Sequence, residues 1–300
     1  MASRLDRAIE QVLQKATGRE ACIVAQQAVT GGCIHQARIV ELHDGGRFFV
    51  KSSSSSSTTV FEREAEGLRA LASVGVLRVP EVVGFGGGGD MEAFLLTEAI
   101  SLGSPGPHFQ EEFGEALARH HRTSSEAAPE AFGFSQDNHL GSTPQPNGWC
   151  DVWVDFWRRH RLGHQLRLAR RAGLGSDELH RLGERLMDHL DDFLSHPDEA
   201  PCLLHGDLWG GNYLVDEAGT PVLIDPAAYY GRREADLAMT RLFGGFGPSF
   251  QRAYEAAWPL ASGSEQRLAI YELYHLLNHL NLFGESYHGS CLSRLRSLEG

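Results

Sequence analysis

The stretch from His205 to Asp225 contains two aspartates and an asparagine at a spacing that suits phosphoryl transfer. Asn212 follows Asp207 by five residues, and Asp225 comes after a further short apolar segment. In kinase-type loops one Asp accepts the proton of the attacking hydroxyl, an Asn binds Mg²⁺, and a distal Asp holds metal against the ATP phosphates. We therefore expect Asp207 to be catalytic and Asn212 and Asp225 to bind magnesium. A turn whose Asp and Asn side chains cap their own backbone would explain one Asp-Gly pair, but not the whole set.

Short apolar runs around these polar residues predict the elements that position them. Residues 202–204 are apolar, and residues 213–215 and 221–224 read as two strands joined by a turn. A short strand before the loop would project its polar groups toward a cleft. The following hairpin would return Asp225 to the side of Asn212, so that both could share a divalent cation.

A glycine-containing turn near the N-terminus is a candidate phosphate-binding element. Alternating segments at 21–29 and 37–42 predict two strands, and Gly31 and Gly32 lie between them. In kinases such a hairpin covers the ATP phosphates with backbone N–H groups, and glycine allows close approach because it has no Cβ. A plain hairpin turn is the alternative, since the segment lacks a complete GxGxxG pattern.

Cys33 lies in the same turn, where backbone N–H groups could favour the reactive thiolate. We hypothesise that its oxidation blocks ATP binding or cross-links two chains into a dimer. A small residue tolerated in a turn is the alternative.

Lys51 ends an apolar run that predicts a strand, which is the position from which kinases reach the α- and β-phosphates. This assignment needs a carboxylate partner, since a lysine at a strand end is usually a solvated edge residue. The predicted helix at 61–72 supplies Glu64, which lies beside its apolar face and could point toward Lys51. Glu62 and Glu66 are alternative partners.

The region around Glu98 to Ile100 is expected to be the hinge that binds adenine through its backbone, because it ends the strand predicted at 93–98. The Gly-, Pro- and Ser-rich stretch 101–107 marks the boundary between two parts of the chain. Residues 109 onward are expected to be mainly helical, with helices at 113–121, 151–171 and 176–195 among others.

Two segments rich in small residues are predicted to be loops. Residues 52–57 are all serine and should form a mobile loop, and residues 84–90 should form a glycine-rich turn. We predict an α+β, bilobal, protein-kinase-like fold. Its small N-terminal lobe, residues 1–100, would contain an antiparallel sheet and one helix and bind ATP, and residues 101–300 would form a mainly helical catalytic and substrate-binding lobe.

The segment Leu204 to Gly247 resembles the fructosamine kinases, also called ketosamine-3-kinases, a branch of the aminoglycoside-phosphotransferase-like kinases. The doubled glycine after Trp209 and the Asp-Pro-Ala at 225–227 favour this branch. Further similar stretches are FGF at 132–134 with GSTPQ at 141–145, DVWVDF at 151–156, and NHLNLFG at 278–284 continuing through YHGS at 287–290. The resemblance implies ATP- and Mg²⁺-dependent phosphorylation of the 3-hydroxyl of ketosamines, carried on small amines or on protein lysines.

The resemblance also assigns supporting roles. It implies that His205 braces the catalytic loop rather than acting as the base, and that Asp236 fixes that loop, although a carboxylate at a helix N-terminus is the plainer reading of Asp236. Trp209 would form a wall of the substrate site, with core packing as the alternative. Three residues near the C-terminus would belong to the ketosamine pocket: His279, Asn281 and Tyr287.

Composition excludes several classes of function. The net charge of −12 makes a nucleic-acid partner unexpected. No stretch approaches the ~20 apolar residues of a membrane span, and the first twenty residues read as an amphipathic helix, so we expect a cytoplasmic protein. The five cysteines show no metal-ligand spacing, and His275 and His279 read as helical histidines more readily than as a zinc pair.

Two other functions remain open at this stage. The chain could phosphorylate another small hydroxyl compound, such as an aminoglycoside or choline. It could also be a catalytically silent nucleotide-binding scaffold, although its complete set of Lys, Glu, Asp, Asn and Asp argues against that.

Overall fold

The structure is a computed structural model that describes residues 3–29, 36–54 and 57–299. Gly31, Gly32 and Cys33 therefore lie outside the described residues. The phosphate-covering turn and the redox role predicted for these three residues stay predictions.

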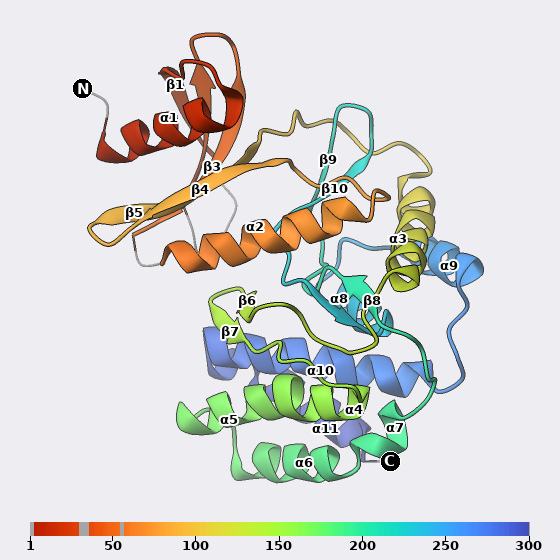
Figure 1. Cartoon of the computed structure of the whole chain (residues 1–300). Helices are drawn as coiled ribbons and strands as arrows, with labels where there is room; N and C mark the ends of the chain where they lie inside the picture. The colour runs from red at the N-terminus through yellow and green to blue at the C-terminus, as the bar shows by residue number, and fades with distance from the viewer. Residues whose placement is uncertain (1–2, 30–35, 55–56, 300) are drawn as a thin grey trace.

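The N-terminal lobe is built on a five-stranded antiparallel sheet with the order β1-β2-β3-β5-β4 (Figure 1). Its strands are β1 Ile23–Val29, β2 Gln36–Leu42, β3 Arg47–Ser53, β4 Val82–Gly88 and β5 Met91–Glu98. Neighbouring strands along the chain pair directly except where the helix between β3 and β4 intervenes, so that β5 inserts between them.

The amphipathic helix predicted in the first twenty residues is confirmed and packs on this sheet, so the lobe contains two helices rather than one. In α1 (Arg4–Thr17), Ile9 and Leu13 are fully buried in a cluster with Phe94 and Leu96 of β5. In α2 (Thr58–Ser73), Phe61, Ala65 and Leu68 instead pack with Ala93 and Leu95 of the same strand. Alternate residues of a strand point to opposite faces, so the two helices cover the two faces of the sheet.

The turn expected over residues 84–90 is confined to residues 89–90, and residues 84–88 are a strand instead. Strand β4 continues through Gly88, which pairs with Met91 of β5. A Cβ on Gly84 would lie 2.6 Å from Val12 of α1, and one on Gly86 would lie 2.9 Å from the Phe94 ring. Glycine is therefore required here because the helix and the aromatic ring approach the strand backbone closely.

The serine run is also only partly a loop. Ser52 and Ser53 belong to β3 and are 4% and 7% exposed. The expectation of a loop over all of residues 52–57 was wrong for these two, because strand pairing with Phe94 and Ala93 continues past Lys51.

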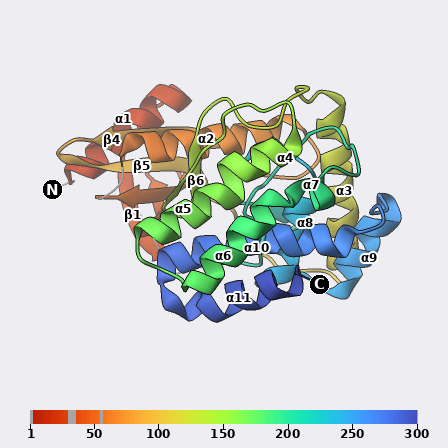
Figure 2. The same cartoon turned by 90° about the horizontal axis from the view of Figure 1, so that it is seen from below.

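The C-terminal lobe is mainly helical, and its long central helix is surrounded by the others (Figures 1 and 2). Its helices are α3 Phe109–Glu126, α4 Trp153–Phe156, a π-helix Trp157–Leu162, α5 Gly163–Arg171, α6 Asp177–Asp188, α7 Leu190–Leu194, α8 Glu234–Leu242, α9 Pro248–Ala257, α10 Ser264–Phe283, a 3₁₀ turn Glu285–Tyr287 and α11 His288–Ser297. Three two-stranded ribbons complete it: β6 Asn138–Leu140 with β7 Thr143–Gln145, β8 Cys202–Leu204 with β11 Tyr229–Gly231, and β9 Tyr213–Val215 with β10 Pro221–Leu223. None of the helices in the described part of the chain is long and apolar enough to cross a membrane.

Two helices expected to be continuous are interrupted. The helix predicted at 151–171 begins at Trp153 and passes through the π-helical segment before α5. The helix predicted at 176–195 divides at His189, whose φ of −108° and ψ of 12° depart from helical values. Both segments keep a helical hydrophobic pattern, so only the packed backbone reveals the interruptions.

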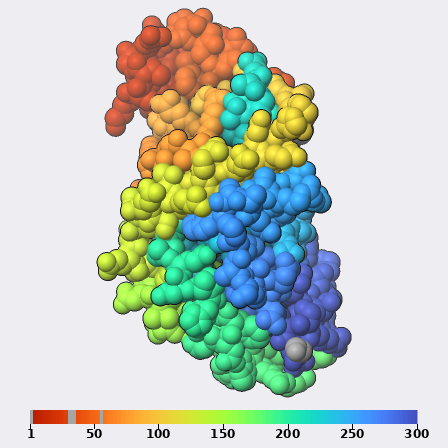
Figure 3. All heavy atoms as spheres, turned by 90° about the vertical axis from the view of Figure 1, so that its right-hand side faces the viewer, coloured from red at the N-terminus to blue at the C-terminus, as the bar shows by residue number. Residues whose placement is uncertain are grey.

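The β9–β10 hairpin connects the two lobes. In Figure 3 its cyan atoms lie against the yellow and orange atoms of the N-terminal half. Gly103 N–H donates to Val215 C=O at 2.9 Å, and Glu217 N–H donates to Ser101 C=O at 3.1 Å. Arg78 adds ion pairs with Asp216 of the hairpin and with Glu98 of β5. The hairpin that leads to Asp225 is therefore held to the segment after β5.

Candidate active site

The loop after β8 brings Asp207 and Asn212 into direct contact. The Asn212 side-chain amide donates to Asp207 Oδ2 at 2.9 Å and to the Asp207 carbonyl at 2.8 Å. Gly206 allows the chain to turn here, because its φ is 82° and a Cβ would lie 2.1 Å from the carbonyl oxygen of Ala227. The loop thus presents a carboxylate and the amide that orients it.

The β9–β10 hairpin returns Asp225 to this loop. Leu223 pairs with Tyr213, and Ile224 N–H donates to the Asn212 carbonyl at 3.0 Å. Asp225 has a φ of 54°, and among the described residues it is the one non-glycine residue with a positive φ. Such a conformation costs about 1–3 kcal/mol and persists only where the surroundings impose it.

Lys51 connects Asp225 to helix α2. Its Nζ donates to both carboxylate oxygens of Glu64 at 3.0 Å and to Asp225 Oδ1 at 2.9 Å. The structure therefore contains the Lys51–Glu64 pair that the helix spacing predicted, whereas Glu62 and Glu66 pair with Arg63. Which ligand Lys51 binds stays a prediction.

Burial and neighbouring charged groups both shift the pKa values in this cluster. Burial raises the pKa of Asp207 to about 7, with the Asn212 hydrogen bond opposing the rise and the Asp225 and Asp236 charges adding to it. Burial alone would lower the pKa of Lys51, but the Glu64 and Asp225 carboxylates outweigh it and raise that pKa. The side-chain cluster carries more carboxylates than cations, which suits a site that binds a metal cation.

The donor set fits Mg²⁺ held jointly with phosphates. The described residues contain no group of three or more His, Cys, Asp or Glu arranged to hold a metal by themselves. Magnesium prefers oxygen ligands and is usually bound through one or two carboxylates together with water and substrate phosphates. Asp225 and the side-chain oxygen of Asn212, whose nitrogen faces Asp207, match that kind of site.

Asp236 holds the start of the catalytic loop. Its carboxylate accepts the backbone N–H groups of His205 and Gly206, each at 2.8 Å, and it is completely buried. His121 Nε2 lies 3.1 Å from the same carboxylate, and His121 Nδ1 lies 2.8 Å from the Tyr254 hydroxyl. Burial alone would raise the pKa of Asp236, but the His121 and backbone hydrogen bonds lower it, so the group is a carboxylate.

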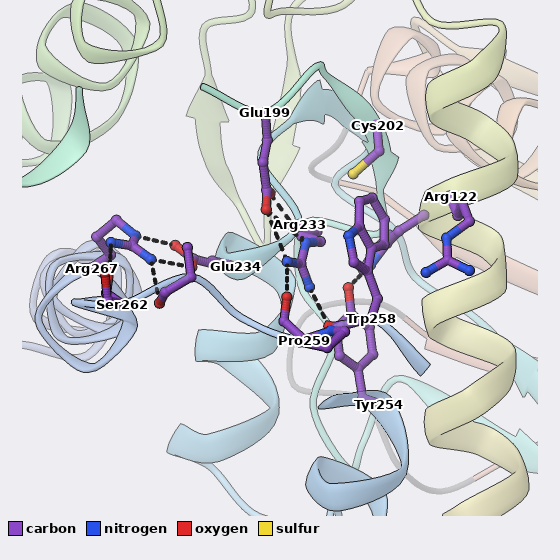
Figure 4. Close-up of polar contacts among 12 residues, drawn as sticks. Arg122, Glu199, Cys202, Arg233, Glu234, Tyr254, Trp258, Pro259, Ser262 and Arg267 are labelled. Carbon is purple, nitrogen blue, oxygen red and sulfur yellow. Dashed lines mark hydrogen bonds and ion pairs between the residues drawn. The ribbon is translucent and has the colours of Figure 1, made fainter. Parts of the chain in front are cut away.

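Helix α8, which carries Asp236, is anchored at its N-terminus by ion pairs (Figure 4). Arg233 pairs with Glu199 at 2.9 Å and donates to the Trp258 and Pro259 carbonyls. Glu234 accepts two hydrogen bonds from the buried Arg267. These contacts fix the helix start, and through it the position of the Asp236 carboxylate.

His205 has both ring nitrogens engaged within the loop. Its Nε2 donates to the Ile224 carbonyl at 2.9 Å, and its Nδ1 accepts the Asp207 N–H at 3.3 Å. Burial lowers its pKa, which favours this neutral ring. The contacts connect the loop to the residue before Asp225, which is the bracing geometry expected for His205.

At the predicted hinge, part of the backbone of Glu98 is already used. Its N–H donates to the Glu81 carbonyl at 2.8 Å, and its side chain pairs with Arg78 at 2.6 Å. An adenine-binding role for Glu98 is therefore restricted to its carbonyl group. Ile100 follows as a half-buried residue outside the strand.

The structure explains the doubled glycine after Trp209. A Cβ on Gly211 would lie 2.4 Å from the Trp209 ring, and one on Gly210 would lie 2.8 Å from the Gly245 Cα. Trp209 itself is half-buried beside the catalytic loop. Its side chain is thus held over the loop backbone.

Of the three residues expected in the ketosamine pocket, His279 and Tyr287 contact each other, whereas Asn281 has a different partner. His279 stacks with Phe243, with ring centroids 4.2 Å apart, and also contacts Tyr287. Asn281 donates to the Gln165 side chain at 2.7 Å. Among the described residues, the hydrogen bonds and ring contacts of His279, Asn281 and Tyr287 do not reach Asp207 or Asn212.

Several residues that support the site were not found from the sequence. His121 of α3 contacts Asp236, and Tyr254 of α9 contacts the other ring nitrogen of His121. Buried amide side chains of β6 and β7 reach the backbone after Asp225. The pattern of His120 and His121 gave no signal, because adjacent helical residues point in different directions. Gln145 lies within a stretch that carried the family resemblance, which was the available clue.

The fold is that of the protein-kinase-like phosphotransferases. An aminoglycoside phosphotransferase has the same fold, with a TM-score of 0.65 at 16% identity over 97% of this chain and 99% of that one. The family model for fructosamine kinase matches residues 5–298, so the chain belongs to the fructosamine kinase family.

Individual relatives agree with this assignment. The chain is 40% identical to a protein from Synechocystis named a probable ketoamine kinase, over 93% of this chain and 92% of that protein. It is also 40% identical to the chloroplastic protein-ribulosamine 3-kinase of Arabidopsis thaliana, over 92% and 83%. A crystal structure from Thermobifida fusca, named as a candidate fructosamine-3-kinase, superposes with a TM-score of 0.84 at 33% identity, over 97% and 98%.

Proposed function

We propose that this protein is an ATP-dependent kinase that phosphorylates the 3-hydroxyl of ketosamines, the ribulosamine or fructosamine adducts on amines and protein lysines. Such an activity would serve protein deglycation. The observation that carries the proposal is the continuous cluster from Asp207 through Asn212 and Asp225 to Lys51 and Glu64, in a member of the fructosamine kinase family.

In the proposed mechanism the nucleotide lies between the lobes formed by residues 1–100 and 101–300. Lys51, held by Glu64, binds the phosphates, and the Glu98 carbonyl and the Ile100 backbone bind adenine. Asn212 and Asp225 would hold Mg²⁺, which supplies positive charge to the phosphates. Gly31 and Gly32 would cover the phosphates with their backbone N–H groups.

Asp207 orients the sugar hydroxyl and accepts its proton. The hydroxyl oxygen forms a bond to the γ-phosphorus of ATP, the bond from that phosphorus to the β–γ bridging oxygen breaks, and ADP leaves. The Asn212 amide keeps the Asp207 carboxylate aimed at the hydroxyl. Trp209, His279, Asn281 and Tyr287 are proposed to contact the ketosamine.

The test is Mg²⁺-dependent release of ADP from ATP with ribulose-lysine, fructose-lysine, kanamycin and choline offered separately. We expect turnover with a ketosamine, and Asp207→Asn should lower kcat by about 100-fold or more while ATP still binds. Near-normal turnover in Asp207→Asn would contradict its role as the base. Turnover with kanamycin or choline alone would move the substrate to another small hydroxyl compound, and ATP binding without any turnover would indicate a silent scaffold.

A further inference from the structure

Two backbone carbonyl groups that follow Asp225 are held by buried amide side chains. Asn138 Nδ2 donates to the Ala228 carbonyl at 2.8 Å, and Gln145 Nε2 donates to the Ala227 carbonyl at 3.0 Å. Gln145 Nε2 also donates to Asn138 Oδ1 at 2.8 Å. Asn138 and Gln145 are 4% and 1% exposed, so these bonds are made away from water.

A buried arginine begins this chain of hydrogen bonds. The Arg161 guanidinium, in the π-helix, donates to Asn147 Oδ1 at 2.8 Å and to the Pro146 carbonyl at 2.7 Å. It lies 4.0 Å from the centroid of the Tyr229 ring and is fully buried. Among the described residues, Arg161 donates these hydrogen bonds to neutral oxygen atoms rather than to carboxylates. Burying a guanidinium in this way costs free energy, so we expect its hydrogen bonds to have a role beyond packing.

This series of hydrogen bonds has a fixed direction, because the arginine side chain can only donate. Asn147 must therefore present its oxygen to Arg161, and its nitrogen then donates to Asn138 Oδ1 at 2.8 Å. With its oxygen accepting, Asn138 has its nitrogen directed at Ala228.

Tyr274 orients Gln145 in the same manner. Its hydroxyl donates to Gln145 Oε1 at 2.7 Å, so that the Gln145 nitrogen faces Ala227 and Asn138. Burial raises the pKa of Tyr274 to about 12, which keeps the proton on this donor. We refer to the five side chains as the Arg161 network: Arg161, Asn147, Asn138, Gln145 and Tyr274.

The backbone between Asp225 and Ala228 is held on both sides. The Ala227 N–H donates to the His205 carbonyl at 2.9 Å, while the Arg161 network binds the two carbonyl groups. Gly67 of α2 packs against the Pro226 side chain, since a Cβ on Gly67 would lie 3.3 Å from it. These restraints act on the residues that directly follow Asp225, whose φ is 54°.

We propose that the Arg161 network is a positioning device for Asp225, which sets the carboxylate in the orientation that binds a magnesium–nucleotide complex. Its members do not touch the nucleotide and act through the backbone of residues 225–228. The inference rests on the proposed function for the assignment of Asp225 as the metal ligand.

Gln145→Glu tests the proposal with little change in shape. The glutamate would face the Ala227 carbonyl with an oxygen in place of the N–H donor, so that the two would repel each other. Gln251→Glu is the matched control, because Gln251 on α9 also donates a side-chain hydrogen bond, but donates it to Thr240 Oγ1 of α8, at 2.9 Å, rather than to the backbone after Asp225.

The measurement is calorimetric binding of AMP-PNP to the full chain, once with excess Mg²⁺ and once with EDTA. We expect Gln145→Glu to weaken binding of the magnesium complex by about tenfold, the effect of one buried donor lost, and to change binding in EDTA by less than about twofold. Gln251→Glu should leave both affinities within about twofold of wild type. In turnover assays, Gln145→Glu should raise the Mg²⁺ concentration for half-maximal rate without raising the KM for the ketosamine.

Unchanged magnesium-complex binding in a folded Gln145→Glu protein would overturn the proposal, as would equal weakening with and without Mg²⁺. If circular dichroism shows that this variant does not fold, Tyr274→Phe replaces it, because it removes only the hydroxyl that orients Gln145. There we expect a loss of about threefold confined to the magnesium complex, and no loss would overturn the proposal. Because AMP-PNP binding needs no ketosamine, a failure of the proposed substrate would leave this result intact.

Discussion

The two ends of the catalytic segment are held by buried networks of opposite polarity. At the first end, the Asp236 carboxylate accepts the N–H groups of His205 and Gly206. At the second end, the Arg161 network donates to the carbonyl groups of Ala227 and Ala228. A buried loop that leaves regular secondary structure exposes both kinds of backbone group, and each kind needs a partner.

The two ends differ in the number of side chains that are needed to bind the backbone groups. One carboxylate has two acceptor atoms and can bind two N–H groups by itself. Each neutral amide must instead have its oxygen held by another donor before its nitrogen points at a carbonyl. Function at the first end is therefore concentrated in Asp236, whereas at the second end it is spread over several residues.

The largest effect is expected from a substitution of Asp236, the single side chain on which the first end depends. In Asp236→Asn the amide nitrogen would face a backbone N–H, and the negative charge beside His121 would be lost. We expect the free energy of unfolding to fall by about 3 kcal/mol and kcat to fall by about 100-fold, because the loop that carries Asp207 would shift. Urea unfolding and ADP release measure the two effects.

Asp188→Asn, at an exposed position near the end of α6, is the control for Asp236→Asn and should change neither quantity noticeably. If Asp236→Asn kept wild-type stability and turnover, the first end of the segment would not depend on that carboxylate, and the comparison between the two networks would fail.

Acid should destabilise the fold through two buried histidines. Burial lowers the pKa values of His120 and His275 to about 3. The ionisable groups that act on them are His121, Asp236 and His205 for His120, and His279, Asp236 and Arg161 for His275. Because the unfolded chain takes up these protons first, stability present above pH 6.5 is lost as the pH falls from 6.5 toward 3.

The expected loss is up to about 1.4 kcal/mol of unfolding free energy per pH unit for each histidine. Urea unfolding at pH 7.5, 6.5 and 5.5 measures it. His120→Leu and His275→Leu should each reduce the slope below pH 6.5, because each removes one buried group that takes up a proton on unfolding. An unchanged slope in both variants would assign the acid sensitivity to other groups.

The smallest effect is expected from Tyr254→Phe, which removes the hydroxyl beside His121 Nδ1. We expect a loss of about 1 kcal/mol in the free energy of unfolding and a change in kcat of only a few fold, because Asp236 keeps its backbone partners. Thermal unfolding and ADP release check this. A loss as large as that of Asp236→Asn would mean that His121, rather than the carboxylate, determines the loop position.

Local patterns predicted the elements that depend on near neighbours. The strand before Lys51, the helix that carries Glu64 and the hairpin before Asp225 all appear in the structure, and Lys51 and Glu64 are paired. Predictions failed where contacts from distant residues decide the backbone. Gly84 and Gly86 read as a turn, yet they lie in a strand that pairs with Leu96 and Phe94 of β5, and glycine is needed there because Val12 and Phe94 approach closely.

The spacing of Asp207, Asn212 and Asp225 within one loop and hairpin was enough to predict phosphoryl transfer, and the chain belongs to a kinase family. The side chains that hold these three residues in place became known from the folded chain. Arg161, Gln145 and Tyr274 come from three separate elements, and their roles depend on which donor meets which acceptor after burial removes water. That pairing is a property of packing in space, so no local pattern of residues can reveal it.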